Sequence, residues 1–165
     1  MARIDNPREL FVHKLGAALT MEETVAGLLE KLQREASDPR LWPSLEQHQR
    51  QTRRQIENIH RAFEALGRKP ESRPCPAIDG LEQEVTLLIG QVGKELVDSV
   101  ILDGVIEIEH YEIAVYDELI ISAETIGEED LVPLFQENRE QEVQTLDIAV
   151  TAAEQLSYRL AKQQS

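Results

Sequence analysis

Several features of common protein classes are missing from this chain of 165 residues. It contains a single cysteine, Cys75, so no intramolecular disulfide can form. It has no apolar run of about 18 residues, which argues against a transmembrane helix, and its first residues, MARIDNPREL, lack the apolar stretch of a signal peptide. We therefore expect a single cytoplasmic domain over residues 1–165 that does not enter a membrane.

Basic residues are scarce in the second half of the chain. The formal net charge is −14; residues 79–165 hold 4 Lys and Arg against 20 Asp and Glu, whereas residues 1–78 hold 13 against 11. Because phosphate contacts need a basic surface, this balance argues against nucleic acid as a partner. We expect most of the carboxylates to form a solvated face and a minority to be candidate cation ligands.

Helical periodicity dominates what is present. Apolar residues recur at spacings of three and four over 7–35, 42–66, 97–126 and about 128–160, and a shorter segment covers 79–92. Prolines and glycines separate these segments, and strand-like alternation never extends beyond four residues. The connection between the second and third long segments, about 30 residues, can cross a bundle from end to end. The pattern predicts an all-α, ferritin-like four-helix bundle with a short extra helix in the long crossover connection.

The third long segment contains two acidic residues where an amphipathic helix normally buries leucine. Glu109 and Glu112 lie on the same stripe as Leu102, Val105 and Leu119. Burying an ionised carboxylate is costly unless it is paired, hydrogen-bonded or bound to a cation. The other long segments are also interrupted near their middles: by Glu22 in the first, by His48, Gln51, Thr52 and Gln55 in the second, and by Gln141 and Glu142 in the fourth.

Carboxylates that converge from four helices, with an imidazole among them, are typical of a carboxylate-bridged dimetal site. Hard oxygen ligands suit iron or manganese. A full di-iron site would carry Glu-x-x-His on two helices, and this chain has no such pair on its stripes, since His48 precedes Gln51 in the reverse order. Buried polar residues that satisfy one another and trapped water are the alternative.

Other residues receive weaker assignments. Tyr116 lies one turn beyond Glu112 and could either hydrogen-bond a ligand carboxylate or pack in the core. His110 lies off the stripe, where packing or surface contact is favoured over ligation. We find no glycine-rich phosphate loop, Ser/His/Asp arrangement or paired-cysteine motif, so the chain identifies no small-molecule substrate and no catalytic residue.

Specific segments make the chain resemble the YciF/YciE family of ferritin-like, rubrerythrin-like bacterial stress proteins, over about residues 8–156. The most specific is E-H-Y-E-I-A at 109–114 with Tyr116 downstream, and it occurs together with CPAIDGLEQE at 75–84. Three further segments match: LFVHKL at 10–15, TMEETV at 20–25 and LEQHQRQTRRQIENIHRAFEALG at 45–67.

The resemblance implies a homodimeric, cytoplasmic, stress-associated protein with a rubrerythrin-like dimetal site. Family carboxylates suited to that site match four residues of this chain, and a frequent family histidine matches a fifth; the metal ligands implied are Glu22, His48, Glu109, Glu112 and Glu142. The family usually has Glu where this chain has Gln51 and Gln141, and some members have His at Gln55. A neutral amide is a weaker ligand than a carboxylate, so these changes lower the expected metal affinity.

Two hypotheses from different classes follow. In the first, the bundle centre binds one or two Fe or Mn ions, and any redox chemistry is iron oxidation with oxygen or peroxide as acceptor, with Tyr116 orienting one ligand. In the second, the protein is a non-catalytic helical scaffold or partner-binding protein that holds no metal, and its carboxylates are a relic. A DNA-protecting ferritin is disfavoured by the acidic charge. The sequence does not decide whether the protein is an enzyme.

Overall fold

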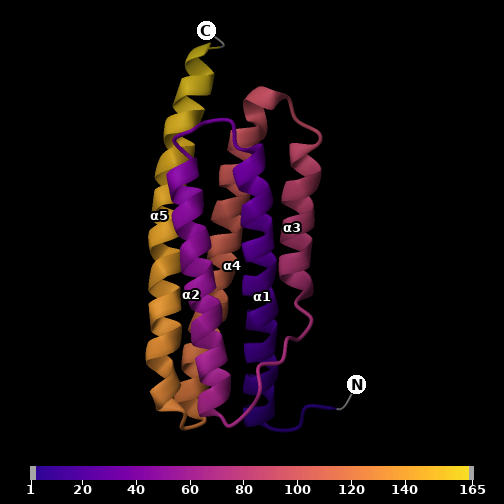
Figure 1. Cartoon of the computed structure of the whole chain (residues 1–165), viewed down its shortest axis with the longest axis vertical. Coiled ribbons are helices and arrows are strands. Elements are labelled where there is room, and N and C mark those ends of the chain that lie inside the picture. The colour runs from indigo at the N-terminus through magenta and orange to yellow at the C-terminus, as the bar shows by residue number, and fades with distance from the viewer. Residues whose placement is uncertain (1–2, 164–165) are drawn as a thin grey trace.

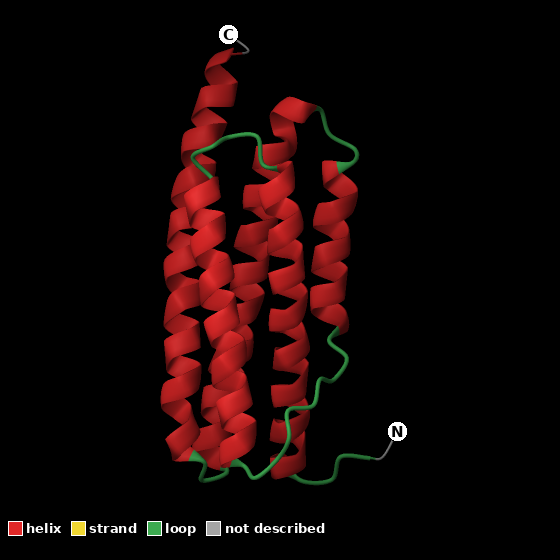
Figure 2. Cartoon of the chain, viewed as in Figure 1, coloured by secondary structure: helices red, strands yellow, loops and turns green. Residues whose placement is uncertain are grey.

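The computed structural model describes residues 3–163, which form helices and connecting loops without any strand (Figure 2). The four long helices are α1 (Pro7–Glu35), α2 (Trp42–Ala65), α4 (Val97–Thr125) and α5 (Val132–Gln163). They lie side by side along the long axis, with α1 and α5 running in one direction and α2 and α4 in the other (Figure 1). Because α2 and α4 are parallel, the chain must return along the length of the bundle between them, which confirms the predicted ferritin-like layout.

The return passes over α1 and then forms α3 (Pro76–Ile89), which packs against α1 and α4. The backbone N–H of Arg73 donates to the carbonyl oxygen of Gly16 in α1, at 2.9 Å. A β-carbon at Gly104 would lie 2.3 Å from Cγ2 of Val85, so glycine is required where α3 approaches α4 closely. A short 3-10 turn, η1 (Lys94–Leu96), leads into α4. Together these segments form the predicted crossover with its short extra helix.

The predicted bounds of the short helix, 79–92, were wrong by about three residues at each end. Pro76 starts α3 because a proline lacks the N–H that the first turn leaves without a partner, and its fixed φ suits a helix. The helix ends at Ile89 because the N–H groups of Gln91 and Val92 both turn back to the carbonyl of Leu88. The bounds of the first three long helices agree with their periodicity to within one residue, whereas the last helix, expected over about 128–160, runs over 132–163.

Sequence signals at the helix ends account for most of these bounds. The side chain of Asn6 accepts a hydrogen bond from the N–H of Glu9 at 2.9 Å and so caps α1. Gly67, which follows α2, has a φ of 68°, in the left-handed region that favours glycine, and so closes this helix. A 3-10 turn with two acidic residues, η2 (Glu129–Leu131), directly precedes α5.

The core is apolar at both ends of the bundle and polar at its centre. Along α1 the buried residues on either side of Glu22 are hydrophobic, among them Leu15 and Leu29. Near one end, the rings of Phe11 and Phe135 pack edge to face with their centroids 6.2 Å apart. Rigid apolar packing above and below therefore fixes the side chains that project into the centre. No helix within residues 3–163 is long and apolar enough to span a membrane.

Candidate metal centre

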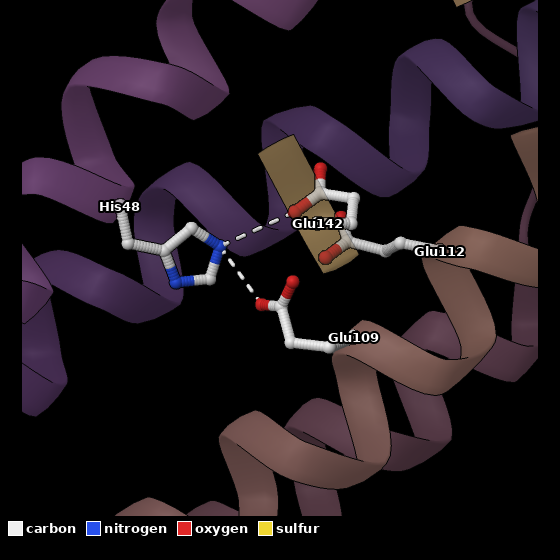
Figure 3. Close-up of side chains that lie close together, drawn as sticks. All are labelled: His48, Glu109, Glu112 and Glu142. Carbon is white, nitrogen blue, oxygen red and sulfur yellow. Dashed lines mark ion pairs between the residues drawn. The ribbon is translucent and has the colours of Figure 1, made fainter. Parts of the chain in front are cut away.

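Three of the long helices bring four potential ligands to a single point. α2 contributes His48, α4 contributes Glu109 and Glu112 at a spacing of i and i+3, and α5 contributes Glu142 (Figure 3). One ligand atom from each residue lies within 4.8 Å of the ligand atoms of the other three. All four side chains are at most 2% exposed. The structure thus brings together four of the five residues predicted as ligands.

The imidazole of His48 turns its Nε2 atom toward the carboxylates. Nε2 lies 3.0 Å from Oε1 of Glu109 and 3.9 Å from Oε2 of Glu142 (Figure 3). The second distance is too long for a hydrogen bond, the first contact does not qualify as one either, and both nitrogens of His48 lack a hydrogen-bond partner among the described residues. These atoms face a shared space between the side chains rather than one another.

Glu22 joins the centre from α1 in a different way. Its Oε1 atom accepts a hydrogen bond from the hydroxyl of Tyr116, while its Oε2 atom has no partner within residues 3–163. Glu22 lies outside the group of four that could share one ion, but it is close enough to raise the pKa of Glu112 by charge repulsion. Of the two roles that the sequence left open for Tyr116, a hydrogen bond to one of the central carboxylates is present, and its acceptor is Glu22.

Unsatisfied polar atoms are concentrated in this cluster. Among the described residues, 13 buried side-chain N and O atoms have no hydrogen-bond partner, and 12 of them belong to residues of the bundle centre. These residues are Glu22, His48, Gln55, Glu109, Glu112, Gln141 and Glu142. Buried polar groups in proteins are nearly always satisfied, so a concentration of this kind requires a physical explanation. A bound cation would provide such an explanation, and so would protons on the carboxyls together with trapped water.

Burial dominates the electrostatics of the centre. Removal from water raises the pKa of Glu109 to about 8 and the pKa values of Glu22, Glu112 and Glu142 well above their ordinary range. Repulsion between the carboxylates adds to this rise, for example the repulsion of Glu142 by Glu109. Burial also lowers the pKa of His48, which favours the neutral imidazole that ligates metals.

The donor set fits divalent metal ions. Three carboxylates and one imidazole suit iron or manganese, which accept oxygen and nitrogen ligands. With Glu22 included, four carboxylates carry −4 when ionised, which balances the charge of two divalent ions. Ion binding would also provide partners for the buried oxygens that lack them. The residues present could therefore hold one ion directly and have the charge to accommodate a second.

The three glutamines near the centre differ in orientation. Gln51 is half-buried, and its Oε1 accepts a hydrogen bond from the hydroxyl of Thr145 at 3.3 Å, so its amide is engaged elsewhere. Gln55 is fully buried, and neither amide atom makes a hydrogen bond, although its proximity to Glu142 lowers the pKa of that carboxyl. Gln141 is half-buried with an unpartnered Oε1. Gln55 is thus a centre residue that our predicted ligand set omitted, although its inward stripe position signalled it.

The other histidines and the cysteine lie outside the cluster. His110 is exposed, which agrees with its predicted position off the stripe, and His13 and His60 are partly buried. Cys75 precedes α3 and is buried, with its sulfur 3.2 Å from the hydroxyl of Tyr111. The sequence offered no signal for this contact, because the residues lie 36 positions apart in different elements.

Comparisons with known proteins agree with this architecture. Residues 6–161 match a family described as "Domain of unknown function (DUF892)". Protein YciF of Escherichia coli (strain K12) is 32% identical over 145 residues, which cover 87% of this chain and 87% of that protein.

Three solved structures share the fold. YcfI of Rhodopseudomonas palustris, described as a candidate structural protein, has a TM-score of 0.89 and 33% identity over 92% of this chain and 98% of its own. The E. coli stress protein YciF has a TM-score of 0.88 and 27% identity over 94% and 99% of the two chains. A protein of Xanthomonas campestris, at 21% identity over 96% and 99% of the two chains and a TM-score of 0.75, supports the fold alone. The family match and these similarities show that this chain belongs to the YciF-like DUF892 family of ferritin-like helical proteins.

Proposed function

We propose that this protein is a stress-associated, metal-binding member of its family that holds one or two iron or manganese ions at the bundle centre. The observation that carries the proposal is the convergence of four ligand residues within 4.8 Å, on oxygens and nitrogens that are buried and unsatisfied. His48, Glu109, Glu112 and Glu142 would hold the first ion. Glu22, with its free Oε2 atom, would contribute to a second. If the bound ion is iron, the chemistry that it would supply is its own oxidation from Fe(II), with oxygen or peroxide as the electron acceptor.

Metal titration tests the proposal. We expect protein purified without chelator to contain iron or manganese, and the metal-free protein to bind Fe(II) anaerobically, or Mn(II), in a ratio of one or two ions per chain. The double variant Glu109→Gln, Glu112→Gln should lose this binding by at least about 100-fold, because it removes two charged ligands without changing side-chain volume. Calorimetry measures both the affinity and the stoichiometry.

The same helix offers a matched control. Asp103 and Glu107 lie on the exposed face of α4, so the double variant Asp103→Asn, Glu107→Gln changes the charge equally but leaves the centre intact. We expect it to bind like the wild type. Absence of stoichiometric binding in the wild type, or equal loss in both double variants, would contradict a specific site at the centre.

A second candidate function has one observation in its favour. The Oε1 atom of Gln51 accepts a hydrogen bond from Thr145, and Gln51 and Gln141 remove two carboxylates that the family usually carries. In this alternative the bundle is a non-catalytic scaffold whose central carboxyls hold protons, as their raised pKa values permit. The scaffold predicts that metal ions leave the midpoint of thermal unfolding unchanged, whereas an ion that binds only the folded state must raise it.

The homodimer and the cytoplasmic location belong to the same proposal. Exposed hydrophobic side chains on α5, such as Ile148 and Tyr158, and Trp42 on α2 leave apolar surface that a second copy could cover. The single buried Cys75, with no disulfide, suits a reducing compartment. Sedimentation of the purified protein at micromolar concentration measures the assembly, and a monomer would contradict this part.

A further inference from the structure

A chain of buried amides leads from Glu22 to the surface of the bundle. The hydroxyl of Tyr116 donates to Glu22 and accepts a hydrogen bond from Nδ2 of Asn138 at 3.0 Å. The Oδ1 atom of Asn138 in turn accepts from Nδ2 of Asn58 at 2.8 Å. The Oδ1 atom of Asn58 accepts from the guanidinium of Arg61 at 3.1 Å. Tyr116 and both asparagines are 0% exposed, whereas Arg61 is exposed.

The direction of each hydrogen bond in this series is determined by groups at its ends that can only donate or only accept. The guanidinium of Arg61 can only donate, so the oxygen of Asn58 must face it and the nitrogen of Asn58 must face Asn138. The backbone carbonyl of Gln55 can only accept, and it lies 3.3 Å from Nδ2 of Asn138. The nitrogen of Asn138 must therefore face the side on which Tyr116 lies.

The fixed direction determines what Tyr116 can do. Because its oxygen already accepts a hydrogen bond from Asn138, its single O–H is left to donate to Glu22. One oxygen of Glu22 is thereby engaged, and the other remains buried and free. By contrast, Glu109 and Glu112 have no hydrogen-bond partner among the described residues, so no donor holds either carboxylate in place.

We propose that Asn138, Asn58 and Arg61 are positioning residues that act through Tyr116 to hold Glu22 as a one-oxygen metal ligand. The effect on metal binding rests on the proposed function, because it requires a metal site at the bundle centre. The orientation of the Tyr116 hydroxyl does not, because it is a property of the metal-free protein. Partners of this kind, one step removed from the ion, commonly change metal affinity by about 10–100-fold. The amides position the ligand and do not relay protons, since an amide N–H does not readily give up its proton.

The first measurement needs no metal. Proton NMR of the metal-free protein should show a slowly exchanging Tyr116 hydroxyl proton, assigned by its loss in Tyr116→Phe. In Asn138→Asp, a side chain of the same shape that offers only acceptors when ionised, the hydroxyl is drawn away from Glu22 and its resonance should move or disappear. An unchanged resonance in Asn138→Asp, or no protected hydroxyl in the wild type, overturns the proposal.

The second measurement is calorimetric titration with Mn(II). Tyr116→Phe and Asn138→Asp should each weaken binding by about 10–100-fold, and the double variant should be no weaker than Tyr116→Phe, because the amide acts only through the phenol. Arg61→Met changes only an exposed side chain, so it keeps the fold and should weaken binding by a smaller factor, about threefold. Ile59→Val alters packing beside Asn58 without touching the chain of donors, and it should bind like the wild type.

The outcomes separate this inference from the proposed function. If the wild type binds Mn(II) and the single variants bind equally well, or if the losses in the double variant simply add, the metal site stands and the positioning role is overturned. If the wild type binds neither Mn(II) nor Fe(II), the proposed function fails, and the NMR measurement alone decides whether the amides orient Tyr116. If Asn138→Asp does not fold, the titration is done with Arg61→Met and Tyr116→Phe. Equal Mn(II) affinity of Arg61→Met and the wild type then overturns the positioning role of the amides.

Discussion

Helix α4 buries carboxylates in two places, and the two places solve the same physical problem differently. Near the start of the helix, Asp98 is 6% exposed and accepts three hydrogen bonds from the loop between α1 and α2. These come from the N–H and hydroxyl of Ser37 at 2.8 and 2.7 Å and from the N–H of Asp38 at 3.0 Å. At the middle of the same helix, Glu109 and Glu112 are fully buried and accept none from the described residues.

The difference shows what kind of role each group has. Hydrogen-bond donors of the protein itself stabilise the carboxylate of Asp98. Its burial is therefore explained by a structural role, because it holds the loop between α1 and α2 against α4. The charges of Glu109 and Glu112 are met by nothing in residues 3–163, so their burial makes sense only if they hold protons or bind a cation. A buried carboxylate that accepts hydrogen bonds from the protein is therefore structural, whereas a buried carboxylate that accepts none is a candidate metal ligand.

The largest effect expected from this contrast is a fall in the stability of the metal-free protein as pH rises. The folded state holds a proton on Glu109 up to about pH 8, whereas the unfolded chain releases it near 4.5. The contribution of this group to stability is therefore full below pH 4.5 and is lost as pH rises to 8, by an amount on the order of 5 kcal/mol. The lowered pKa of His48 acts in the opposite sense below its ordinary value of 6.5, so the window from pH 6.5 to 8 reports the carboxyls alone.

Urea unfolding with chelator present, at steps between pH 6.5 and 8, measures this slope. Glu109→Gln should make this slope shallower, because it removes one of the four buried carboxyls whose pKa values are raised, whereas Asp98→Asn should leave the slope in place. Saturating Mn(II) should flatten it too, since bound carboxylates are ionised throughout the window. A slope that is equal in the wild type and Glu109→Gln would show that Glu109 does not hold a proton in this window.

A smaller effect on the free energy of unfolding is expected from a substitution of Asp98. Asp98→Ala removes three accepted hydrogen bonds and leaves two backbone N–H groups of the loop without their partner. We expect a loss of about 2–3 kcal/mol in the free energy of unfolding, since hydrogen bonds to charged groups contribute most and the site is only partly enclosed. Mn(II) affinity should not change. Chemical unfolding and titration of one preparation measure both, and a drop in affinity would break the distinction between the two carboxylate types.

The sequence predicted the fold well because helix formation and burial follow from local pattern. The stripe of Leu102, Val105 and Leu119 is buried as periodicity requires, and Gly67 closes α2. The same logic placed Glu109 and Glu112 inward, because a position at helical spacing stays on its face whatever residue occupies it.

Partners far apart in the chain could not be predicted in the same way. Asp98 meets Ser37 from 61 residues away, and Asn58 meets Asn138 from 80 residues away, so no local pattern records these pairings. Nor could spacing reveal that Gln51 engages Thr145 while Gln55 stays unpaired.

The smallest effect that we expect concerns the difference between Gln51 and Gln55. Both Gln51 and Gln55 interrupt the apolar stripe of α2, but only Gln55 is fully buried with both amide atoms unpaired beside Glu142. Gln55→Glu should therefore add a charged ligand and raise Mn(II) affinity about tenfold, or about 1.4 kcal/mol. Gln51→Glu adds the same charge to a half-buried side chain that engages Thr145, so it should change affinity by less than about threefold. Calorimetric titration of the two variants side by side measures the difference. If Gln51→Glu proves the stronger binder, the centre lies closer to Gln51 than the unpaired atoms indicate, and Gln55 is a buried amide without a role in ligation.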